Sequence, residues 1–296
     1  MSEFSDKIKG ALLGYILGDS KATGTNCQVS YNFDILSALT DLISKRKDYD
    51  EILAGSEYIR VVNMTKRLRL PSKNIMYLFK NVKYFGYLDR YNRKKTKIGT
   101  RLYTFESNDA MNRALPLACY CLTRPDDIFD VSNRDCSITN PTDIAKLVNQ
   151  VYIATLLCFI IDECSQSEIL DSLIEQFFGE NEYLDSVLNA VKTNTPLDLP
   201  DAPKAWCVTA LYQSLDLVFN KESFSLNGIH KTNYTIAGCL WGAKYGYISL
   251  MRNKNIRIYM ARVFDCDAAN GRDVRSIDPI DMSDLSRTLI KISGDN

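Results

Sequence analysis

The sequence predicts an all-α fold, and three observations lead to this prediction. Apolar residues recur at helical spacing over most of the chain, alternation of apolar and polar residues is rare, and two segments carry glycine at every fourth position. With 296 residues, 46% of them from the set AVILMFWYC, the chain is long enough to bury a sizeable core. No break in composition divides it, so we expect one compact domain over residues 1–296.

Helices are expected wherever the apolar spacing follows one helical face. Residues 6–17 form the first, and residues 143–161, which follow Pro141 and Thr142, form the clearest. Within the latter, residues 151–161 are the longest apolar run, which suits a buried core helix and is shorter than the ~18 residues of a membrane span. The other expected helices lie at residues 33–44, 50–64, 167–178, 182–192, 204–219 and 235–251.

Three segments are less regular. Residues 256–264 fit either a strand or the end of a helix, and residues 82–105, rich in Tyr and Phe, are a plausible site for a hairpin around Asn92. A small β element is therefore compatible with the all-α prediction. The acidic, turn-like residues 265–284 are expected to pack as an exposed tail.

The two glycine ladders consist of Gly10, Gly14 and Gly18, and of Gly238, Gly242 and Gly246. Each ladder places three positions without side chains on one helical face. Glycine inside a helix costs about 1 kcal/mol relative to alanine, so the ladders must be compensated, and close approach of another helix would do so. We expect both helices to lie in the interior, in the simplest case against one another.

Composition excludes several classes of function. Lys+Arg and Asp+Glu are equal at 36 each, so no global charge recruits nucleic acid or a membrane. The first ten residues lack an apolar signal core, and the nine cysteines form no CxxC pair, which together favour reduced thiols and a cytoplasmic protein. The single histidine, His230, argues against zinc hydrolases and nucleophile–histidine enzymes unless it is itself the base. No phosphate-binding glycine motif occurs.

A basic segment at residues 90–101 (RYNRKKTKIGTR) has tyrosines and a phenylalanine on its flanks. Basic residues neutralise phosphates and aromatic rings stack on bases, so this segment is a candidate patch for single-stranded nucleic acid or an ADP-ribose polymer. A solvated basic loop with core tyrosines explains the same pattern.

Four segments, in order, resemble the ADP-ribosylglycohydrolase family. They are KIKGALLGYILGDS (7–20), NDAMNRALPLA (108–118), NPTDIAKLVNQVYIATL (140–156) and TIAGCLWGAKYG (235–246). The resemblance covers nearly the whole chain. It implies a compact all-α fold with a cleft that holds two magnesium ions and ADP-ribose.

At the positions where the resemblance implies metal-binding aspartates, this chain has other residues. The first turn falls on Ser30, Tyr31 and Asn32, and the second on Ile229, His230, Lys231 and Thr232. Two Mg²⁺ ions require anionic oxygen ligands, whereas Lys231 brings a cation. We therefore expect no metal cofactor, although the family implies magnesium. The cleft candidates implied by the resemblance are Ser30, Tyr31, Asn32, Asn108, Arg113, Asn140, His230 and Lys231.

Two functions follow from this changed lining. The first is a non-catalytic binding or interaction protein, whose cleft offers Lys231 and Arg113 to ADP-ribose, another anion or a protein partner. The alternative is an active hydrolase of an ADP-ribose glycosidic bond with a rearranged or metal-free site, for which Asp19, Asp34 and Asp109 are the available acids. Within the first, Lys231 either meets an anion or points to solvent beside a cleft filled by Tyr31 and Ile229.

Overall fold

A computed structural model describes residues 3–23, 28–64, 72–83, 105–199, 202–270 and 282–294. Within these ranges the chain is all-α, as the sequence predicts, and the β structure is limited to an isolated bridge between Ser107 and Trp206. The expected hairpin and the basic segment 90–101 lie outside the described residues, except for the ends of the hairpin segment at 82–83 and 105.

Each helix expected from the spacing is present, and its ends agree within a few residues. The α-helices are α1 (Glu3–Ala22), α2 (Tyr31–Arg46), α3 (Glu51–Met64), α4 (Lys73–Phe79), α7 (Ala114–Cys121), α8 (Ile128–Thr139), α9 (Asp143–Ile161), α10 (Gln166–Phe177), α11 (Glu182–Thr193), α12 (Cys207–Asn220), α13 (Tyr234–Arg252), α14 (Lys254–Asn270) and α15 (Met282–Ile292). Short 3₁₀ turns are η1 (Met111–Arg113), η2 (Pro125–Asp127) and η3 (Lys231–Asn233).

Local side chains set several helix ends. Ser30, Ser165 and Asn181 cap the first turns of α2, α10 and α11, and Ser165 forms a reciprocal capping box with Glu168. At the other ends of α2 and α9, Lys47 and Asp162 adopt the left-handed conformation that closes a helix.

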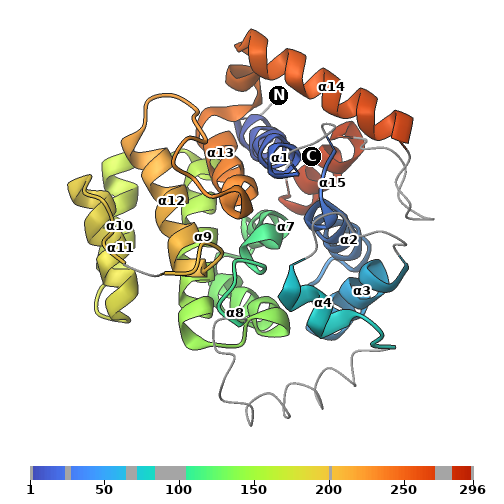
Figure 1. The fold of residues 1–296 in the computed structure, drawn as a ribbon, viewed down its shortest axis with the longest axis horizontal. Coiled ribbons are helices and arrows are strands. Elements are labelled where there is room, and N and C mark those ends of the chain that lie inside the picture. Colours follow the sequence, from blue (N-terminus) through green and yellow to red (C-terminus); the bar gives the residue numbers. More distant parts are fainter. Residues whose placement is uncertain are drawn as a thin grey trace.

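The two glycine ladders face each other across the centre of the fold. A methyl group built on Gly14 would overlap the carbonyl of Gly238, and one built on Gly10 would overlap the carbonyl of Gly242. In Figure 1, α1 and α13 lie side by side between α12 and α15. The expectation that the ladders lie in the interior against one another is confirmed.

Around this central pair, the helices form groups (Figure 1). Helices α2, α3 and α4 pack on one side, the hairpin of α10 and α11 packs on α9 and α12 on the other, and α14 crosses the top over α13 and α1. One cluster of buried apolar side chains runs through these groups, from Ile8 to Leu289.

Two of the less regular segments are helical. Of the two alternatives for residues 256–264 the helix is correct, because they lie within α14 and Ile256, Met260 and Val263 share one buried helical face. Of the residues expected to be a turn-like exposed tail, 271–281 lie outside the described residues, whereas 265–270 end α14 and 282–284 begin α15. The turn-like part of that expectation is wrong at these helical ends, and α15 packs on α1, α2 and α7 with Leu289 fully buried. The apolar face of α15 lies mostly beyond residue 284, so the acidic stretch before it concealed the helix.

One helix within the described ranges, α9, is long and apolar enough to cross a membrane by length and composition. Of its apolar window, 61% is buried inside the structure, as in a core helix. The seven described cysteines are all free, consistent with the reduced thiols expected from the sequence.

Candidate functional site

Asp19, near the end of α1, joins the first of the two turns that the resemblance associates with metal binding to the start of α13, which follows the second turn. Its carboxylate accepts hydrogen bonds from the backbone N–H of Ser30 (2.5 Å), from the Ser30 hydroxyl (2.7 Å) and from the Thr235 hydroxyl (3.1 Å). The Ser30 oxygen also accepts from the backbone N–H of Asn32, which caps α2. Asp19 is 1% exposed, so one buried carboxylate ties together α1 and the first turns of α2 and α13.

Asp109 is the centre of a second buried cluster. The Tyr31 hydroxyl donates to Asp109 Oδ1 (3.0 Å), while the Ser107 hydroxyl (2.6 Å) and the Asn74 amide (3.0 Å) donate to Oδ2. Burial, reinforced by the charge of Asp109, raises the pKa of Tyr31 well above its usual value. The phenol therefore stays protonated and serves as a hydrogen-bond donor.

Arg113 lies in the interior beside this cluster. Its Nε contacts Asp135 Oδ2 at 2.6 Å, and its other nitrogens donate to the backbone oxygens of Asp109 and Asp135 and to the Thr139 hydroxyl. The hydroxyls of Tyr58 (2.6 Å) and Tyr49 (3.1 Å) donate to Asp135 Oδ1. Both members of the Arg113–Asp135 pair are almost fully buried, so the charge of Arg113 is already neutralised.

A chain of amides holds the second turn. Asn108 Nδ2 donates to Asn233 Oδ1 (2.7 Å) and to the backbone oxygen of Thr232 (2.9 Å). Asn233 in turn donates to Gln213 Oε1 (2.8 Å), which also accepts the backbone N–H of His230 (3.1 Å). These bonds fix η3 at the start of α13, so the position of Lys231 is set by its neighbours.

Lys204, His230 and Lys231 form a basic rim at the surface beside η3. Both lysines are exposed, and His230 is half-buried, with Nδ1 2.8 Å from the Thr232 hydroxyl. Burial lowers the pKa of His230, and the charges of Lys204 and Lys231 lower it further. The two lysines therefore lie close enough to His230 to interact with it electrostatically, and the positively charged rim attracts negative charge.

The structure does not bring the eight cleft candidates together as one open lining. Ser30, Tyr31, Asn108, Arg113 and Asn140 are buried, Asn32 and His230 are half-buried, and Lys231 is exposed. Asn140 is fully enclosed, and its amide donates to backbone oxygens of Phe105 and Ser107. The expectation that Arg113 offers a free cation is wrong, because its guanidinium forms a buried salt bridge with Asp135. The lysine at 231 does lie at the surface, and Tyr31 fills interior space.

Several polar residues of these clusters escaped the sequence analysis. Asp135, Asn74 and Gln213 belong to none of the four resembling segments and occur in no recognisable motif. Asn233 directly follows the second turn and precedes α13 by one residue. An asparagine at this position is a signal for the start of a helix, so the sequence could have marked it as a structural residue.

The residues at the two turns do not fit a pair of magnesium ions. Ser30 Oγ is engaged by Asp19 and by the backbone of Asn32, the Tyr31 hydroxyl is engaged by Asp109, and Lys231 carries a positive charge. Among the residues that the structure describes, no group of three or more His, Cys, Asp or Glu side chains has the arrangement of a metal site. We therefore derive no chemistry through a metal.

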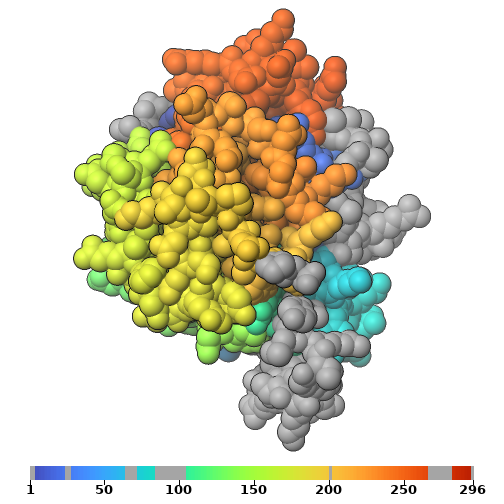
Figure 2. Space-filling model, turned by 60° about the vertical axis from the view of Figure 1, so that its left-hand side comes forward, coloured from blue at the N-terminus to red at the C-terminus, as the bar shows by residue number. Residues whose placement is uncertain are grey.

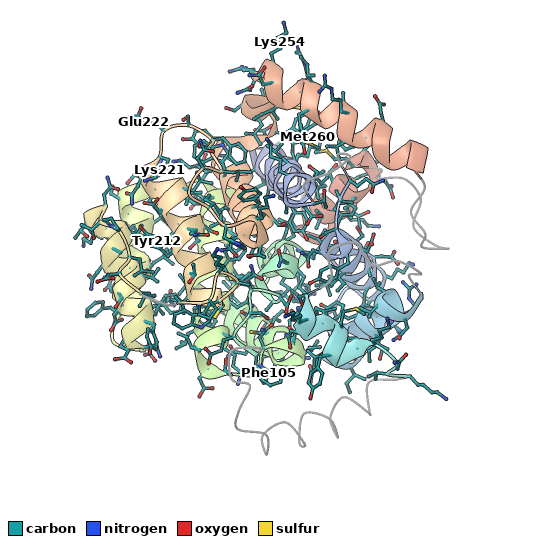
Figure 3. The ribbon with its side chains drawn as sticks, viewed as in Figure 1. Phe105, Tyr212, Lys221, Glu222, Lys254 and Met260 are labelled. Carbon is teal, nitrogen blue, oxygen red and sulfur yellow. The ribbon has the colours of Figure 1, made fainter. Side chains whose placement is uncertain are left out.

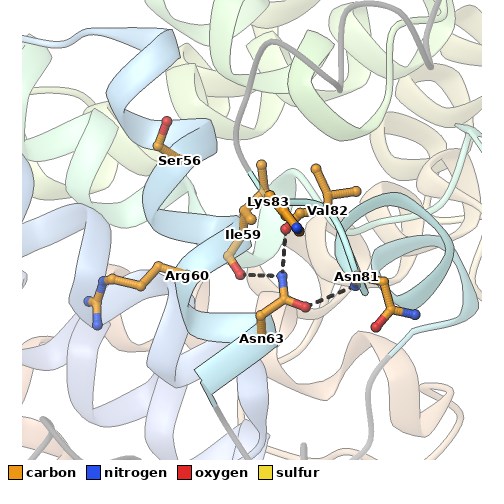
Figure 4. Close-up of a pocket in the computed structure, with 7 residues that line it drawn as sticks. All are labelled: Ser56, Ile59, Arg60, Asn63, Asn81, Val82 and Lys83. Carbon is orange, nitrogen blue, oxygen red and sulfur yellow. Dashed lines mark hydrogen bonds between the residues drawn. The ribbon is translucent and has the colours of Figure 1, made fainter.

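A separate cavity of about 520 Å³ lies between α3 and the segment after α4 (Figure 4). Asn63 forms part of its wall. The Asn63 amide donates to backbone oxygens of Ile59, Phe79 and Val82, and its oxygen accepts from the N–H of Asn81. None of the cleft candidates lines this cavity, and the polar atoms of Asn63 already have partners from the chain itself.

Comparisons with known proteins identify the fold and the family. The chain is similar to a solved structure described as an ADP-ribosylglycohydrolase-related protein complex, with a TM-score of 0.67 and 18% sequence identity over 99% of this chain and 100% of that chain. At this identity the similarity establishes the fold. A search of curated proteins gave no match. The family model described as ADP-ribosylglycohydrolase matches residues 1–253, which is most of the sequence. The chain therefore belongs to the ADP-ribosylglycohydrolase family.

Proposed function

We propose that this chain is a non-catalytic member of its family, and that it binds an anionic group at the rim of Lys204, His230 and Lys231. The observation that carries the proposal is the position of Lys231. An exposed ammonium stands where the family resemblance places a metal-binding aspartate, with a second lysine and a histidine beside it. Such a group attracts a phosphate or diphosphate directly, without a bridging metal ion.

The hydrogen bonding of the buried acids supports a loss of catalysis. A metal-free glycosidase needs one carboxyl group that can give up a proton and one that can accept it or attack the sugar. Asp19 and Asp109 each accept three hydrogen bonds from the chain, and both are almost fully buried. Engaged in this way, they act as links between helices. The alternative, an active hydrolase with a rearranged site, would have to free one of these two or use Asp34, which is also buried.

A hydrolysis assay separates the two functions. The protein is incubated with a mono-ADP-ribosylated substrate, with Mg²⁺ or with EDTA, and released ADP-ribose is measured. We expect no release above the uncatalysed rate in either condition. Release that EDTA abolishes would contradict the proposal, and release that EDTA leaves unchanged would establish the metal-free hydrolase instead.

Calorimetry tests the binding half of the proposal. We expect ADP-ribose to bind equally well with and without Mg²⁺, and the Lys231→Ala variant to bind about tenfold more weakly, which is about 1.4 kcal/mol. Lys73→Ala, which removes an exposed lysine on α4, is the matched control and should leave binding unchanged. Absence of binding by the wild-type protein, or equal binding by Lys231→Ala, would refute the anion rim.

A further inference from the structure

The outward face of α14 carries positive charge that the described chain does not neutralise. Lys254, Arg257 and Arg262 are exposed on this face around Ile258, which is 43% exposed. Arg252, which ends α13, is exposed beside them. In the part of the chain that the structure describes, no carboxylate pairs with any of these four cations. In Figure 3, Lys254 points away from the molecule and Met260 points toward it.

The sequence around α14 explains this excess. No Asp or Glu occurs between Glu222 and Asp265, so this part of the surface lacks carboxylates until the far end of the helix. The opposite face of α14 is buried on α13 and α1, which fixes the direction in which the cations project. We call the exposed residues 252, 254, 257, 258 and 262 the basic face.

The turn between α10 and α11 has the opposite charge around an apolar centre. Phe178 is 54% exposed and Tyr183 is 40% exposed, although both are large apolar rings. Glu175, Glu180 and Glu182 surround them and are exposed. We call these five residues the acidic turn.

Most other acids of the same hairpin already have partners. Asp171 pairs with Lys192 at 3.0 Å, Asp185 accepts the backbone N–H of Gly179, and Glu168 completes the capping box. The three glutamates of the acidic turn have no such partner among the described residues. Their charge is therefore available to another molecule.

The basic face and the acidic turn cannot neutralise each other within one chain. In Figure 1, α10 and α11 lie at the left edge and α14 lies across the top, with α12 and α13 between them. Figure 2 shows the hairpin projecting toward the viewer while α14 forms the upper rim. The net charge of the whole chain is zero, so two copies experience no long-range repulsion when they approach.

We propose that the basic face of one copy docks on the acidic turn of a second copy. Arg257 and Arg262 would pair with the glutamates, since guanidinium groups form strong charge-assisted bonds to carboxylates. The same groups stack on aromatic rings, which Phe178 and Tyr183 offer. The two surfaces differ, so the contact is head-to-tail, and each copy keeps one surface free for a further copy.

Other anionic partners fit the basic face less well. Single-stranded nucleic acid binds through aromatic stacking, and the exposed part of α14 carries an isoleucine and an alanine but no exposed aromatic ring. A membrane-surface helix buries a broad apolar face, whereas over residues 254–265 of α14 only Ile258 and Ala261 are exposed apolar residues. A second copy supplies both the charge and the apolar contact.

Sedimentation velocity of the full chain tests the proposal. We expect the average mass to rise with protein concentration at about 0.02 M salt, and to return to that of the monomer at about 0.5 M, where charges are screened. The double variant Arg257→Glu/Arg262→Glu should remain monomeric at low salt, and so should Glu175→Arg/Glu180→Arg.

Mixing the arginine variant with the glutamate variant tests whether the two surfaces contact each other directly. Each variant alone repels itself, but together they present opposite charges again, so the equimolar mixture should associate at low salt. Lys73→Glu/Lys80→Glu makes the same change in net charge as Arg257→Glu/Arg262→Glu, at exposed positions at the two ends of α4, and should associate as the wild type does. The six residues changed in these variants are all exposed, and circular dichroism checks that each variant folds.

Three results would overturn the proposal: a wild-type chain that stays monomeric at low salt, association unaffected by either reversal, or a mixture that fails to associate. Anionic vesicles and a single-stranded RNA are tested in parallel. Binding of either to a monomeric wild-type chain, lost in Arg257→Glu/Arg262→Glu, would assign the basic face to that partner instead of to a second copy.

Discussion

At the scale of single residues, the site is a set of buried polar groups whose partners come from distant parts of the chain. Asp19 binds Ser30 and Thr235, Asp109 binds Tyr31, and Asp135 binds Arg113. A buried charge is tolerated only when it is paired and hydrogen-bonded. These aspartates therefore hold helices together, and their removal should affect stability before it affects binding.

The Arg113–Asp135 pair gives the clearest case. Arg113→Met leaves the Asp135 carboxylate buried without its counter-charge, and we expect a loss of about 3–5 kcal/mol in the free energy of unfolding, measured with urea. Arg134→Met is the control, because Arg134 pairs with Glu51 at a position where both side chains are over a third exposed. That change should cost no more than about 1 kcal/mol. Equal losses in the two variants would contradict the assigned role of Arg113.

His230 makes anion binding at the rim depend on pH. Its pKa is lowered by burial and by Lys204 and Lys231, so the ring is neutral at pH 7. As pH falls through this lowered pKa, the ring gains a proton and adds a third positive charge. We expect the affinity for ADP-ribose to rise between about pH 7 and about pH 5. Calorimetry on His230→Gln, which cannot titrate, should give a flat profile, and a rise in that variant would assign the pH dependence elsewhere.

The same shift predicts a small effect on folding. The unfolded histidine binds a proton near its ordinary pKa of about 6.5, before the folded one does. Between that value and the lowered folded pKa, the unfolded state holds more protons. The contribution of His230 to stability is therefore present above that pH window and is lost as pH falls through it.

At the scale of elements, the packing of α1 on α13 determines the arrangement of the fold. The glycine ladders let the two backbones approach so closely that side-chain atoms do not fit between them. The site lies beside this pair, since Asp19 of α1 accepts a hydrogen bond from Thr235 in the first turn of α13. Any change in the spacing of the two helices is thereby transmitted to the site.

Gly14→Ala tests this packing. The added methyl group overlaps the backbone of Gly238, which cannot move aside as a side chain can, so we expect a loss of at least about 3 kcal/mol. Gly179→Ala is the control, because nothing lies near its added methyl group and only its positive φ is unfavourable, which costs about 1 kcal/mol. Thermal unfolding followed by circular dichroism compares the two, and a milder effect at Gly14 would refute the close packing.

At the scale of the whole molecule, hydrogen bonds of the chain itself connect the two turns. Asp19, which holds Ser30 of the first turn, accepts from Thr235 across 216 residues, and Asn108 donates to Asn233, which follows the second turn, across 125. A fold held in this way needs no cation for its cohesion. Stability then becomes a test of metal binding that does not depend on catalysis.

We therefore expect Mg²⁺ and EDTA to leave the melting temperature unchanged within about 1 °C. A site saturated at a hundred times its Kd would add about 2.7 kcal/mol, or roughly 5 °C for a chain of this size. Scanning fluorimetry over a range of Mg²⁺ concentrations measures the difference. A saturable rise of that size would show that the chain binds the ion after all.

The sequence by itself determined most of the long helices, the family and the contact of the two glycine ladders. These depend on local information: helical spacing, capping residues, and small side chains at every fourth position. It did not predict the shorter helices α4, α7 and α8, and it missed α15 because the acidic residues before that helix resemble a loop. It assigned Arg113 to an open cleft because no local pattern marks Asp135 as its partner.

Only the tertiary structure decided which polar groups meet. Arg113 and Asp135 are separated by 22 residues, Tyr31 and Asp109 by 78, and Asn108 and Asn233 by 125. The spacing of residues in the sequence does not predict such long-range pairs. The pairs form when helices pack and bury charged groups, which then require partners. For this reason the residue types at the two turns could be compared with the family pattern from the sequence, while the hydrogen bonds that hold these turns could not be predicted from it.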